Sequence, residues 1–279
     1  MSAPEMFVRP GVRLAVHDCG GPGIPFVFQH GLCGSAAQTA EVMPDNAGIR
    51  PITLECRGHG ASEAGDPTSF SIAAFTDDVA ALIEARNLAP VVAGGISMGA
   101  AMAARLAVRR GELVRALVLA RPAWVTDAAP ANAAAYRDVG ALLARHSPQE
   151  ARALFLASAT AQYLRELAPD NLASLTGFFD RQPHGVTSEL LTRIAADGPG
   201  VTPSDLGNIT CPVLIIGHGD DLAHPFAACE ELAALIPHAR LVRITSKVQS
   251  KAAYVADLKA ALSAFLEDIA HGTTQSRLV

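Results

Sequence analysis

Short apolar runs alternate with longer segments of helical hydrophobic period along most of the chain. The segment at 71–87 is an example of the helical pattern, with Ile72, Phe75, Val79 and Leu82 recurring on one face. The runs that predict strands are 6–8, 13–17, 25–29, 50–55, 90–94, 113–120, 211–217 and 239–244. The segments that predict helices around them are 71–87, 100–109, 225–235 and 252–269. This alternation predicts an α/β protein whose mostly parallel sheet is covered by helices on both faces.

The pattern changes between residues 121 and 203. Four Ala-rich helical segments follow one another there without a convincing strand, at about 130–145, 148–168, 170–181 and 187–196. We therefore predict a helical cap at 122–203, inserted into an α/β core formed by 1–121 and 204–271. The last residues, 272–279, are predicted to be a disordered tail.

Composition narrows the class of protein. Half of the 279 residues are hydrophobic and 18% are charged, which suits one large domain with a sizeable core. The net charge of −5 is spread without long like-charge runs, so neither nucleic acid nor a membrane is predicted as a partner. A small-molecule substrate is expected, and a homo-oligomer is left open.

The cysteines and the first residues predict a cytoplasmic location. The five cysteines are odd in number and lack C-x-x-C spacing, which favours reduced thiols over a disulfide framework or a zinc site. The chain begins without a basic segment followed by an apolar one, so no export signal is predicted. No apolar stretch reaches the length of a transmembrane helix.

Residues 95–99 read Gly-Ile-Ser-Met-Gly and lie between a predicted strand and a predicted helix. A serine between two glycines at such a turn is the pattern of a nucleophile elbow. The turn is so tight that a side chain two residues before or after Ser97 would collide with neighbouring backbone, and glycine removes this collision. The elbow would expose the Ser97 hydroxyl at the top of the sheet. It would also direct the Met98 amide into the same space as half of an oxyanion hole.

Four segments, in this order, resemble the α/β-hydrolase superfamily. They are His-Gly-Leu at 30–32, Arg-Gly-His-Gly-Ala-Ser at 57–62, the elbow at 95–99, and Gly-His-Gly-Asp-Asp-Leu-Ala-His-Pro at 217–225. The resemblance covers nearly the whole chain. It implies an eight-stranded, mostly parallel sheet with a cap over the site, and Ser97 as the nucleophile of a Ser-Asp-His triad.

The resemblance also implies the second half of the oxyanion hole. The amide of Leu32 is expected to join that of Met98 in binding the negative oxygen of a tetrahedral intermediate. His30 is read either as a loop-shaping histidine bonded to backbone or as a substrate-binding residue. Trp124, near the expected hinge of the cap, is read either as a pocket residue or as ordinary core.

The acid is expected in the loop after the seventh strand, because catalytic groups collect at the carboxyl ends of the strands in open α/β sheets. In the family the acid commonly lies four residues before a proline, which selects Asp221 before Pro225. Asp220 is the alternative in the same loop. Asp127, after the sixth strand, is a more distant candidate.

The sequence does not show which residue is the general base of the triad. The family places its histidine after the eighth strand, yet no histidine occurs from residue 239 to 270. A serine at its free pKa is a poor nucleophile and needs a base within hydrogen-bond reach.

Three explanations remain open for the base. His224, His218 or His30 stands in for the missing residue. Alternatively, Lys247 or Lys251, which are in the expected loop, acts as a base with a depressed pKa. In the third explanation the base is absent, naturally or by replacement, and Lys251 marks the position of the replaced histidine.

The sequence therefore predicts a serine hydrolase that cleaves an ester, lactone, amide or activated C–C bond of a small carbonyl substrate through an acyl-enzyme. No metal or organic cofactor is implied, because no zinc-protease, dinucleotide or Walker motif is present. One alternative keeps the serine chemistry, as a cofactor-free perhydrolase or acyltransferase. Another is a base-deficient binding protein or inactive variant with the same fold.

Overall fold

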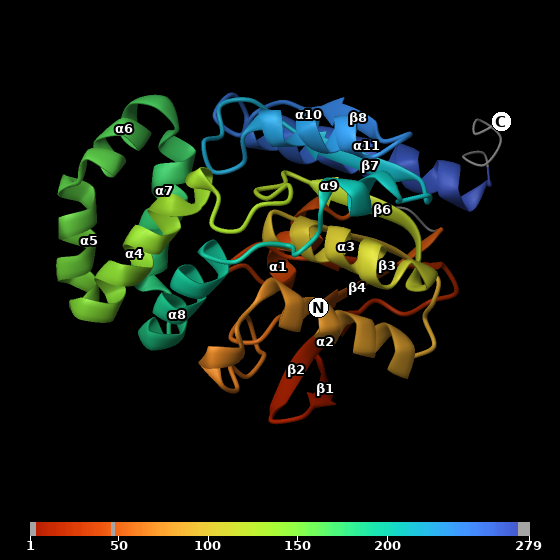
Figure 1. Ribbon diagram of the computed structural model, residues 1–279, viewed down its shortest axis with the longest axis horizontal. Helices are drawn as coiled ribbons and strands as arrows, with labels where there is room; N and C mark the ends of the chain where they lie inside the picture. Colours follow the sequence, from red (N-terminus) through yellow and green to blue (C-terminus); the bar gives the residue numbers. More distant parts are fainter. Residues whose placement is uncertain (1–3, 46–47, 273–279) are drawn as a thin grey trace.

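The computed structural model describes residues 4–45 and 48–272, and its centre is one eight-stranded sheet (Figure 1). The strands lie in the order β1-β2-β4-β3-β5-β6-β7-β8. Their bounds are β1 Glu5–Arg9, β2 Val12–Asp18, β3 Ile24–Gln29, β4 Ile49–Leu54, β5 Val91–Ile96, β6 Val114–Ala120, β7 Val213–Gly217 and β8 Arg240–Arg243. Only the pairings of β2 with β1 and β4 are antiparallel, which confirms the predicted mostly parallel sheet.

Helices cover both faces of this sheet. One face packs against α11 (Lys251–Ala270), whose Tyr254, Leu258 and Leu262 share an apolar cluster with Phe26 on β3, and α1 (Ala36–Val42) adds Val42. The other face packs against four helices: α2 (Ile72–Ala85), α3 (Met98–Arg109), α9 (Pro203–Gly207) and α10 (Phe226–Leu235). The central strands are therefore buried on both sides, which is why they read as continuous apolar runs rather than alternating ones.

Five of the six α-helices between β6 and β7 form the group at the left of Figure 1, and the sixth is α9. The five are α4 (Ala134–Arg145), α5 (Pro148–Ala157), α6 (Ala159–Leu167), α7 (Pro169–Gly177) and α8 (His184–Ala195), and we call them the cap helices. They have an apolar cluster of their own, centred on Val139, Phe155, Leu175, Phe179 and Leu191. The division into core (1–121 and 204–271) and cap (122–203) stays a prediction. The tail predicted at 272–279 lies outside the described residues except for Gly272.

The structure adds three details that the apolar pattern did not predict. Helices α1 and α9 are too short to show a clear period, and α9 begins instead with a capping box between Thr202 and Asp205. The segment predicted as one helix at 148–168 is two helices that meet at Ser158. The Ser158 hydroxyl accepts a hydrogen bond from the Ala161 amide at 3.2 Å, so it caps α6 where α5 ends.

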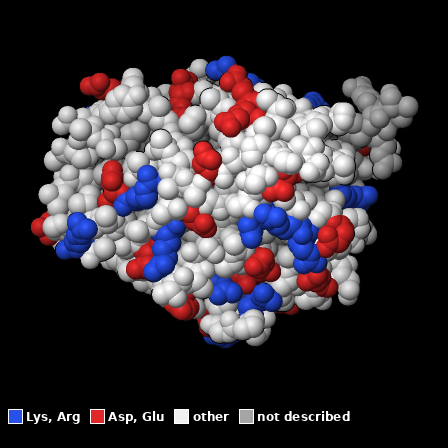
Figure 2. Space-filling model, viewed as in Figure 1, with Lys and Arg blue, Asp and Glu red and all other residues white. Residues whose placement is uncertain are grey.

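The surface carries both signs of charge. Acidic and basic side chains are interspersed over the face in Figure 2, and many of them are paired, as Arg110 is with Glu84 and Glu112. Within residues 4–45 and 48–272, no helix combines the length and the apolar character needed to cross a membrane. The predicted cytoplasmic location and the predicted lack of nucleic-acid partners remain predictions.

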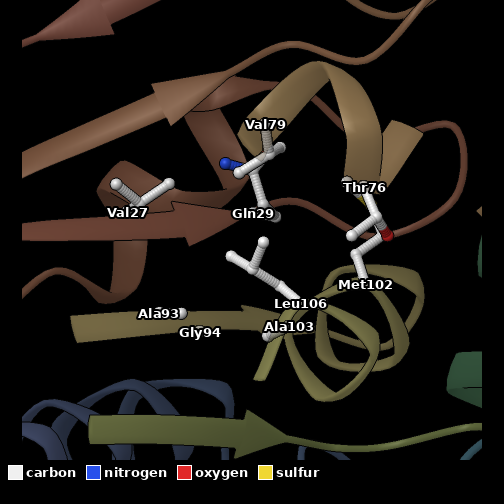
Figure 3. A pocket seen from close by; sticks show the side chains of 9 residues that line it. All are labelled: Val27, Gln29, Thr76, Val79, Ala93, Gly94, Met102, Ala103 and Leu106. Carbon is white, nitrogen blue, oxygen red and sulfur yellow. The ribbon is translucent and has the colours of Figure 1, made fainter. Parts of the chain in front are cut away.

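A small internal cavity of about 10 Å³ lies between the sheet and helices α2 and α3 (Figure 3). The side chain of Gln29, at the end of β3, lies among Val79, Thr76 and Leu106 there. Within the described residues, neither its Nε2 nor its Oε1 has a hydrogen-bond partner. Such an unpaired buried group costs about 1–3 kcal/mol, which the surrounding apolar packing must offset.

Candidate active site

Ser97 occupies a strained turn between β5 and α3. Its backbone has φ 57° and ψ −110°, a conformation that few residues other than glycine adopt. A Cβ on Gly95 would lie 2.4 Å from the backbone carbon of Gly99, and a Cβ on Gly99 would lie 2.4 Å from the Gln29 carbonyl oxygen. Both glycines are therefore required by close backbone approach, as expected for a nucleophile elbow.

His224 lies next to the serine hydroxyl. Its Nε2 is 2.9 Å from Ser97 Oγ, and its Nδ1 is 3.0 Å and 3.1 Å from the two carboxylate oxygens of Asp221. His224 and Asp221 belong to the loop at 218–225 that follows β7, which we call the β7 loop. A carboxylate accepts from Nδ1–H, so this pairing fixes the tautomer whose Nε2 lone pair faces the serine. The three side chains are in series, from carboxylate to imidazole to hydroxyl.

Asp221 is a buried carboxylate with several partners. The Arg121 guanidinium donates to its Oδ2 from Nη2 at 2.6 Å and from Nε at 3.1 Å, and the Asn171 amide donates to its Oδ1 at 3.0 Å. Burial alone would raise the pKa of Asp221, but the charge of Arg121, the charge of His224 in its protonated form at low pH, and the hydrogen bonds from both residues hold this pKa well below its usual value. The carboxylate is therefore ionised at neutral pH and able to orient the imidazole.

Two effects compete at His224. Burial lowers the pKa of His224 and the nearby Arg121 lowers it further, whereas the Asp221 carboxylate raises it; the net pKa is below the ordinary value. The imidazole is consequently neutral at pH 7, which is the form that accepts a proton from a serine hydroxyl.

The amides predicted to form an oxyanion hole, those of Leu32 and Met98, have no acceptor among the described hydrogen bonds. In the loop at 30–34, which we call the oxyanion loop after the role predicted for it, the amide of Gly31 donates to Gln38 Oε1 at 2.7 Å and that of Cys33 donates to His59 Nε2 at 2.9 Å. The Leu32 amide lies between these two in the chain, and the Met98 amide is at the start of α3. A Cβ on Gly31 would lie 3.4 Å from Ser97 Cβ, so this loop packs directly against the elbow. The oxyanion hole formed by the Leu32 and Met98 amides stays a prediction.

The two lysines after β8 are engaged elsewhere. Lys251 begins α11 with a side chain that is 71% exposed, and its Nζ pairs with Glu41 at 2.8 Å. Lys247 lies with its Nζ 4.8 Å from the centre of the Tyr254 ring, and burial lowers the pKa of Lys247 to about 8. Neither lysine has a described hydrogen bond to Ser97, so the geometry favours His224 over both as the base.

The other histidines have structural contacts. His30 is fully buried, with Nε2 accepting from the Cys56 amide at 3.1 Å and Nδ1 2.9 Å from the Gly31 carbonyl oxygen. This is the loop-shaping role, and it leaves no ring nitrogen for the predicted contact with substrate. His218 donates from Nδ1 to the Gly219 carbonyl oxygen at 2.5 Å, and its Nε2 faces Asp221 Oδ2 at 3.6 Å rather than Ser97.

The remaining sequence candidates have no described hydrogen bond or ion pair with Ser97 or His224. Trp124 is buried in the core and donates from Nε1 to the Asp197 carbonyl oxygen at 2.9 Å. This position favours its interpretation as a core residue over its interpretation as a pocket residue. Asp220 and Asp127 are exposed, and Asp220 has φ 57° in the turn before Asp221. Of the three acid candidates, only Asp221 contacts a histidine that reaches Ser97.

Arg121 and Asn171 were missed by the sequence reasoning. Arg121 had a usable signal, because a charged residue directly follows the buried apolar strand β6 at the catalytic edge of the sheet. Asn171 had none, since it is on α7 and 50 positions before Asp221.

Two cavities are each lined partly by residues of the cap region and partly by loops of the core. One, of about 380 Å³, is lined by Cys33 and Gly34 of the oxyanion loop and by Pro183 and Val186 near α8. The other, of about 360 Å³, is mostly apolar and is bounded by cap residues such as Tyr136 together with Leu222 and Ala223 of the β7 loop. Both volumes suit a small molecule. Within the described residues, no three His, Cys, Asp or Glu side chains are grouped to hold a metal ion.

The sequence matches the family described as the alpha/beta hydrolase fold over residues 24–246. The chain belongs to this family. Its fold, with the eight-stranded, mostly parallel sheet, agrees with the resemblance seen in the sequence.

Proteins with several different named activities are similar to this α/β hydrolase. A Mycobacterium tuberculosis protein named non-heme bromoperoxidase BpoC is 32% identical over 82% of this chain and 87% of the relative. An Agrobacterium fabrum protein named carbamate hydrolase RutD is 31% identical over 77% of this chain and 82% of the relative. The enol-lactonase from Burkholderia xenovorans shares the fold with a TM-score of 0.69 and 23% identity, over 97% of this chain and 100% of that one. The chain is a hydrolase of the α/β-hydrolase family.

Proposed function

We propose that this protein is a serine hydrolase that cleaves an ester, lactone, amide or activated C–C bond of a small carbonyl compound through an acyl-enzyme. The observation that carries the proposal is the series Asp221–His224–Ser97, with His224 Nε2 2.9 Å from Ser97 Oγ and Nδ1 3.0 Å from Asp221 Oδ2. The relative named carbamate hydrolase supports a carbonyl substrate.

The first half of the reaction forms the acyl-enzyme. Ser97 Oγ attacks the substrate carbonyl carbon while its proton passes to His224 Nε2. Asp221 stabilises the imidazolium through Nδ1–H, and His224 then donates the proton to the leaving group as the tetrahedral intermediate collapses. The leaving group departs as an alcohol or amine, or as the protonated carbon when a C–C bond is cleaved.

The oxyanion of that intermediate would be bound by the Leu32 and Met98 amides, which have no acceptor among the described hydrogen bonds. Each such donor contributes about 2.7–4 kcal/mol to the stabilisation of a transition state in a dry site. The amides are held by the backbone of the elbow and of the 30–32 loop, so little reorganisation is required when charge develops.

The second half releases the acid. Water gives a proton to His224 Nε2 as its oxygen attacks the acyl carbon, and His224 returns that proton to Ser97 Oγ when the C–O bond to the enzyme breaks. The products are a carboxylic acid and the free serine.

Turnover of a short-chain p-nitrophenyl ester tests this function. The wild-type protein should release p-nitrophenol with a burst equal to the enzyme concentration when deacylation is slow, and Ser97→Ala should abolish both burst and turnover. Ser263→Ala, at a half-buried serine on α11 outside the site, is the matched control and should behave as wild type. Undiminished turnover by Ser97→Ala would refute the proposal.

Two alternatives make different predictions for the same assay. The base-deficient binding protein depended on a missing histidine, and the position of His224 favours the enzyme over it. A perhydrolase or acyltransferase would use the same acyl-enzyme but pass the acyl group to hydrogen peroxide or an alcohol. Faster p-nitrophenol release on adding either acceptor, with a peracid or a new ester as product, would favour it over the hydrolase.

A further inference from the structure

The two oxygens of Asp221 are held from opposite parts of the molecule. Oδ2 accepts from Arg121, the residue that follows β6 in the core, and Oδ1 accepts from Asn171 on cap helix α7. Asn171 is also bonded to the β7 loop backbone, because its Oδ1 accepts from the amides of Leu222 at 2.8 Å and Ala223 at 3.1 Å. The acid is therefore fixed by one residue of the core and one of the cap.

Arg121 is a buried residue with a fixed backbone conformation. Its side chain is 6% exposed, and its backbone has φ 45°, in the left-handed region that is rare outside glycine. Its own amide donates to the Ile216 carbonyl oxygen at 2.6 Å, which continues the pairing of β6 with β7. The guanidinium carbon also lies 5.7 Å from the centre of the Tyr254 ring.

The guanidinium is close to the imidazole as well as to the acid. Arg121 Nη2 lies 3.1 Å from His224 Nδ1. A fixed positive charge at this distance disfavours the imidazolium and favours the neutral ring. Arg121 thus has two effects on the triad: it orients the carboxylate with a rigid fork of donors, and it opposes protonation of His224.

We propose that Arg121 is a positioning residue of the triad that sets the protonation equilibrium of His224, and that Asn171 joins the cap to the same carboxylate. The proposal concerns the site of the proposed hydrolase function and so rests on it. The two residues differ in one testable respect, since Arg121 brings a charge to the triad and Asn171 does not. Loss of either should disturb the orientation of Asp221, but only loss of Arg121 should move the titration of His224.

The other ionisable groups near His224 do not change between these variants. They come from four segments: Asp221 and His218 from the β7 loop, Lys247 from the loop at 244–250 after β8, Tyr254 from α11, and Tyr136 from cap helix α4. Lys247 lowers the pKa of His224 in the same direction as Arg121 but more weakly, and Asp221 raises this pKa. The matched variants therefore isolate the Arg121 charge against a constant background.

An NMR titration of the His224 imidazole tests the charge directly and needs no substrate. The His224 signal is identified by its loss in His224→Gln. Arg121→Gln should raise the pKa of His224 by about one pH unit or more, because a positive charge near the ring is removed. Arg121→Lys keeps the charge and should leave the pKa near the wild-type value, and Asn171→Ala should do the same.

Ester kinetics test the orientation. Arg121→Gln, Arg121→Lys and Asn171→Ala should each lower kcat/KM by about 100-fold, because the carboxylate and imidazole lose their fixed geometry. Only Arg121→Gln should also shift the acid limb of the pH profile to higher pH. The matched control is Arg57→Gln, which breaks the buried pair of Arg57 with Asp78 outside the triad and should leave the acid limb unchanged.

Several results would overturn the proposal. An unchanged pKa of His224 in folded Arg121→Gln would remove the electrostatic role, and an equal shift in Arg121→Lys or Asn171→Ala would show that disturbed structure is the cause. If Arg121→Gln does not fold, unchanged kcat/KM in Arg121→Lys and Asn171→Ala would still refute the positioning role. Failure of the hydrolase function is seen separately, as turnover that survives Ser97→Ala.

Discussion

The β7 loop and the loop after β8 (residues 244–250, the β8 loop) leave neighbouring parallel strands at the same edge of the sheet, yet they differ in chemistry. The β7 loop buries Asp221 and His224 against Ser97. The β8 loop, where the family resemblance places the histidine, carries Lys247 packed on Tyr254. A general base must lie within hydrogen-bond distance of the nucleophile. Two loops at the same edge of the sheet can both place a side chain at that distance.

The spacing of Asp221 and His224 explains how one short loop presents both groups. Asp221 Oδ1 accepts a hydrogen bond from the His224 backbone amide at 3.1 Å, so the carboxylate closes the turn that carries the imidazole. Pro225 then leads into α10. The same side chain therefore shapes the loop and orients the base.

The largest expected effect separates the two loops. His224→Ala should lower kcat for ester hydrolysis by about 10⁶-fold, as removal of the base does in other serine hydrolases. Lys251→Ala, in the region where the family histidine is expected, should leave kcat unchanged because Lys251 pairs with Glu41 at the surface. Steady-state kinetics on both variants measure the contrast. Equal losses would mean that the β8 side of the site also takes part in proton transfer.

The next largest effect on kcat is expected from a change at Asp221, the proposed acid in the β7 loop. Asp221→Asn should lower kcat by about 10⁴-fold, because the amide no longer stabilises the imidazolium or fixes its tautomer. Asp220→Asn is the control from the same loop, and its exposed side chain predicts no change. A strong loss in Asp220→Asn with an active Asp221→Asn would reverse the assignment of the acid.

The pH dependence gives a smaller effect. Because the pKa of His224 is lowered, the ring stays neutral, and so active as a base, to a lower pH than an unperturbed histidine. We expect the acid limb of kcat/KM to have its midpoint below about pH 6.5, the ordinary histidine value. The pKa of Lys247 is lowered to about 8, so a lysine base would instead place the midpoint near that value. A rate profile from pH 4.5 to 9 distinguishes the two.

The smallest effect is expected from restoring a histidine on the β8 side. Lys251→His should leave kcat within about twofold of wild type and the melting temperature unchanged, since single changes at exposed positions have little effect. A large gain would indicate that the site lacks a base, and that His224 does not fill the role.

The sequence predicted the parts of the molecule that local chemistry determines. The strands around Ser97 are buried on both faces and therefore appear in the sequence as continuous apolar runs. The glycines at 95 and 99 are required because a Cβ at either position would lie 2.4 Å from neighbouring backbone, so they appear as a Gly-x-Ser-x-Gly motif. The break at Ser158 was missed because one capping hydroxyl decides it within a continuous helical period. The choice of base among Lys247, Lys251 and the histidines depended on which loop bends toward Ser97. The contact of Asn171 with Asp221 depends on how the cap packs against the core. Neither the bend of a loop nor the packing of the cap can be obtained from sequence spacing alone.

The central claim is that His224 activates Ser97, and the rate of Ser97 modification by a fluorophosphonate tests it most directly. Intact-mass and peptide mass spectrometry should find one adduct, on Ser97, formed rapidly in the wild-type protein and in Lys251→Ala. His224→Ala, still folded by circular dichroism, should form that adduct slower by several orders of magnitude, because the hydroxyl has lost its base. Labelling of His224→Ala at the wild-type rate would contradict the account.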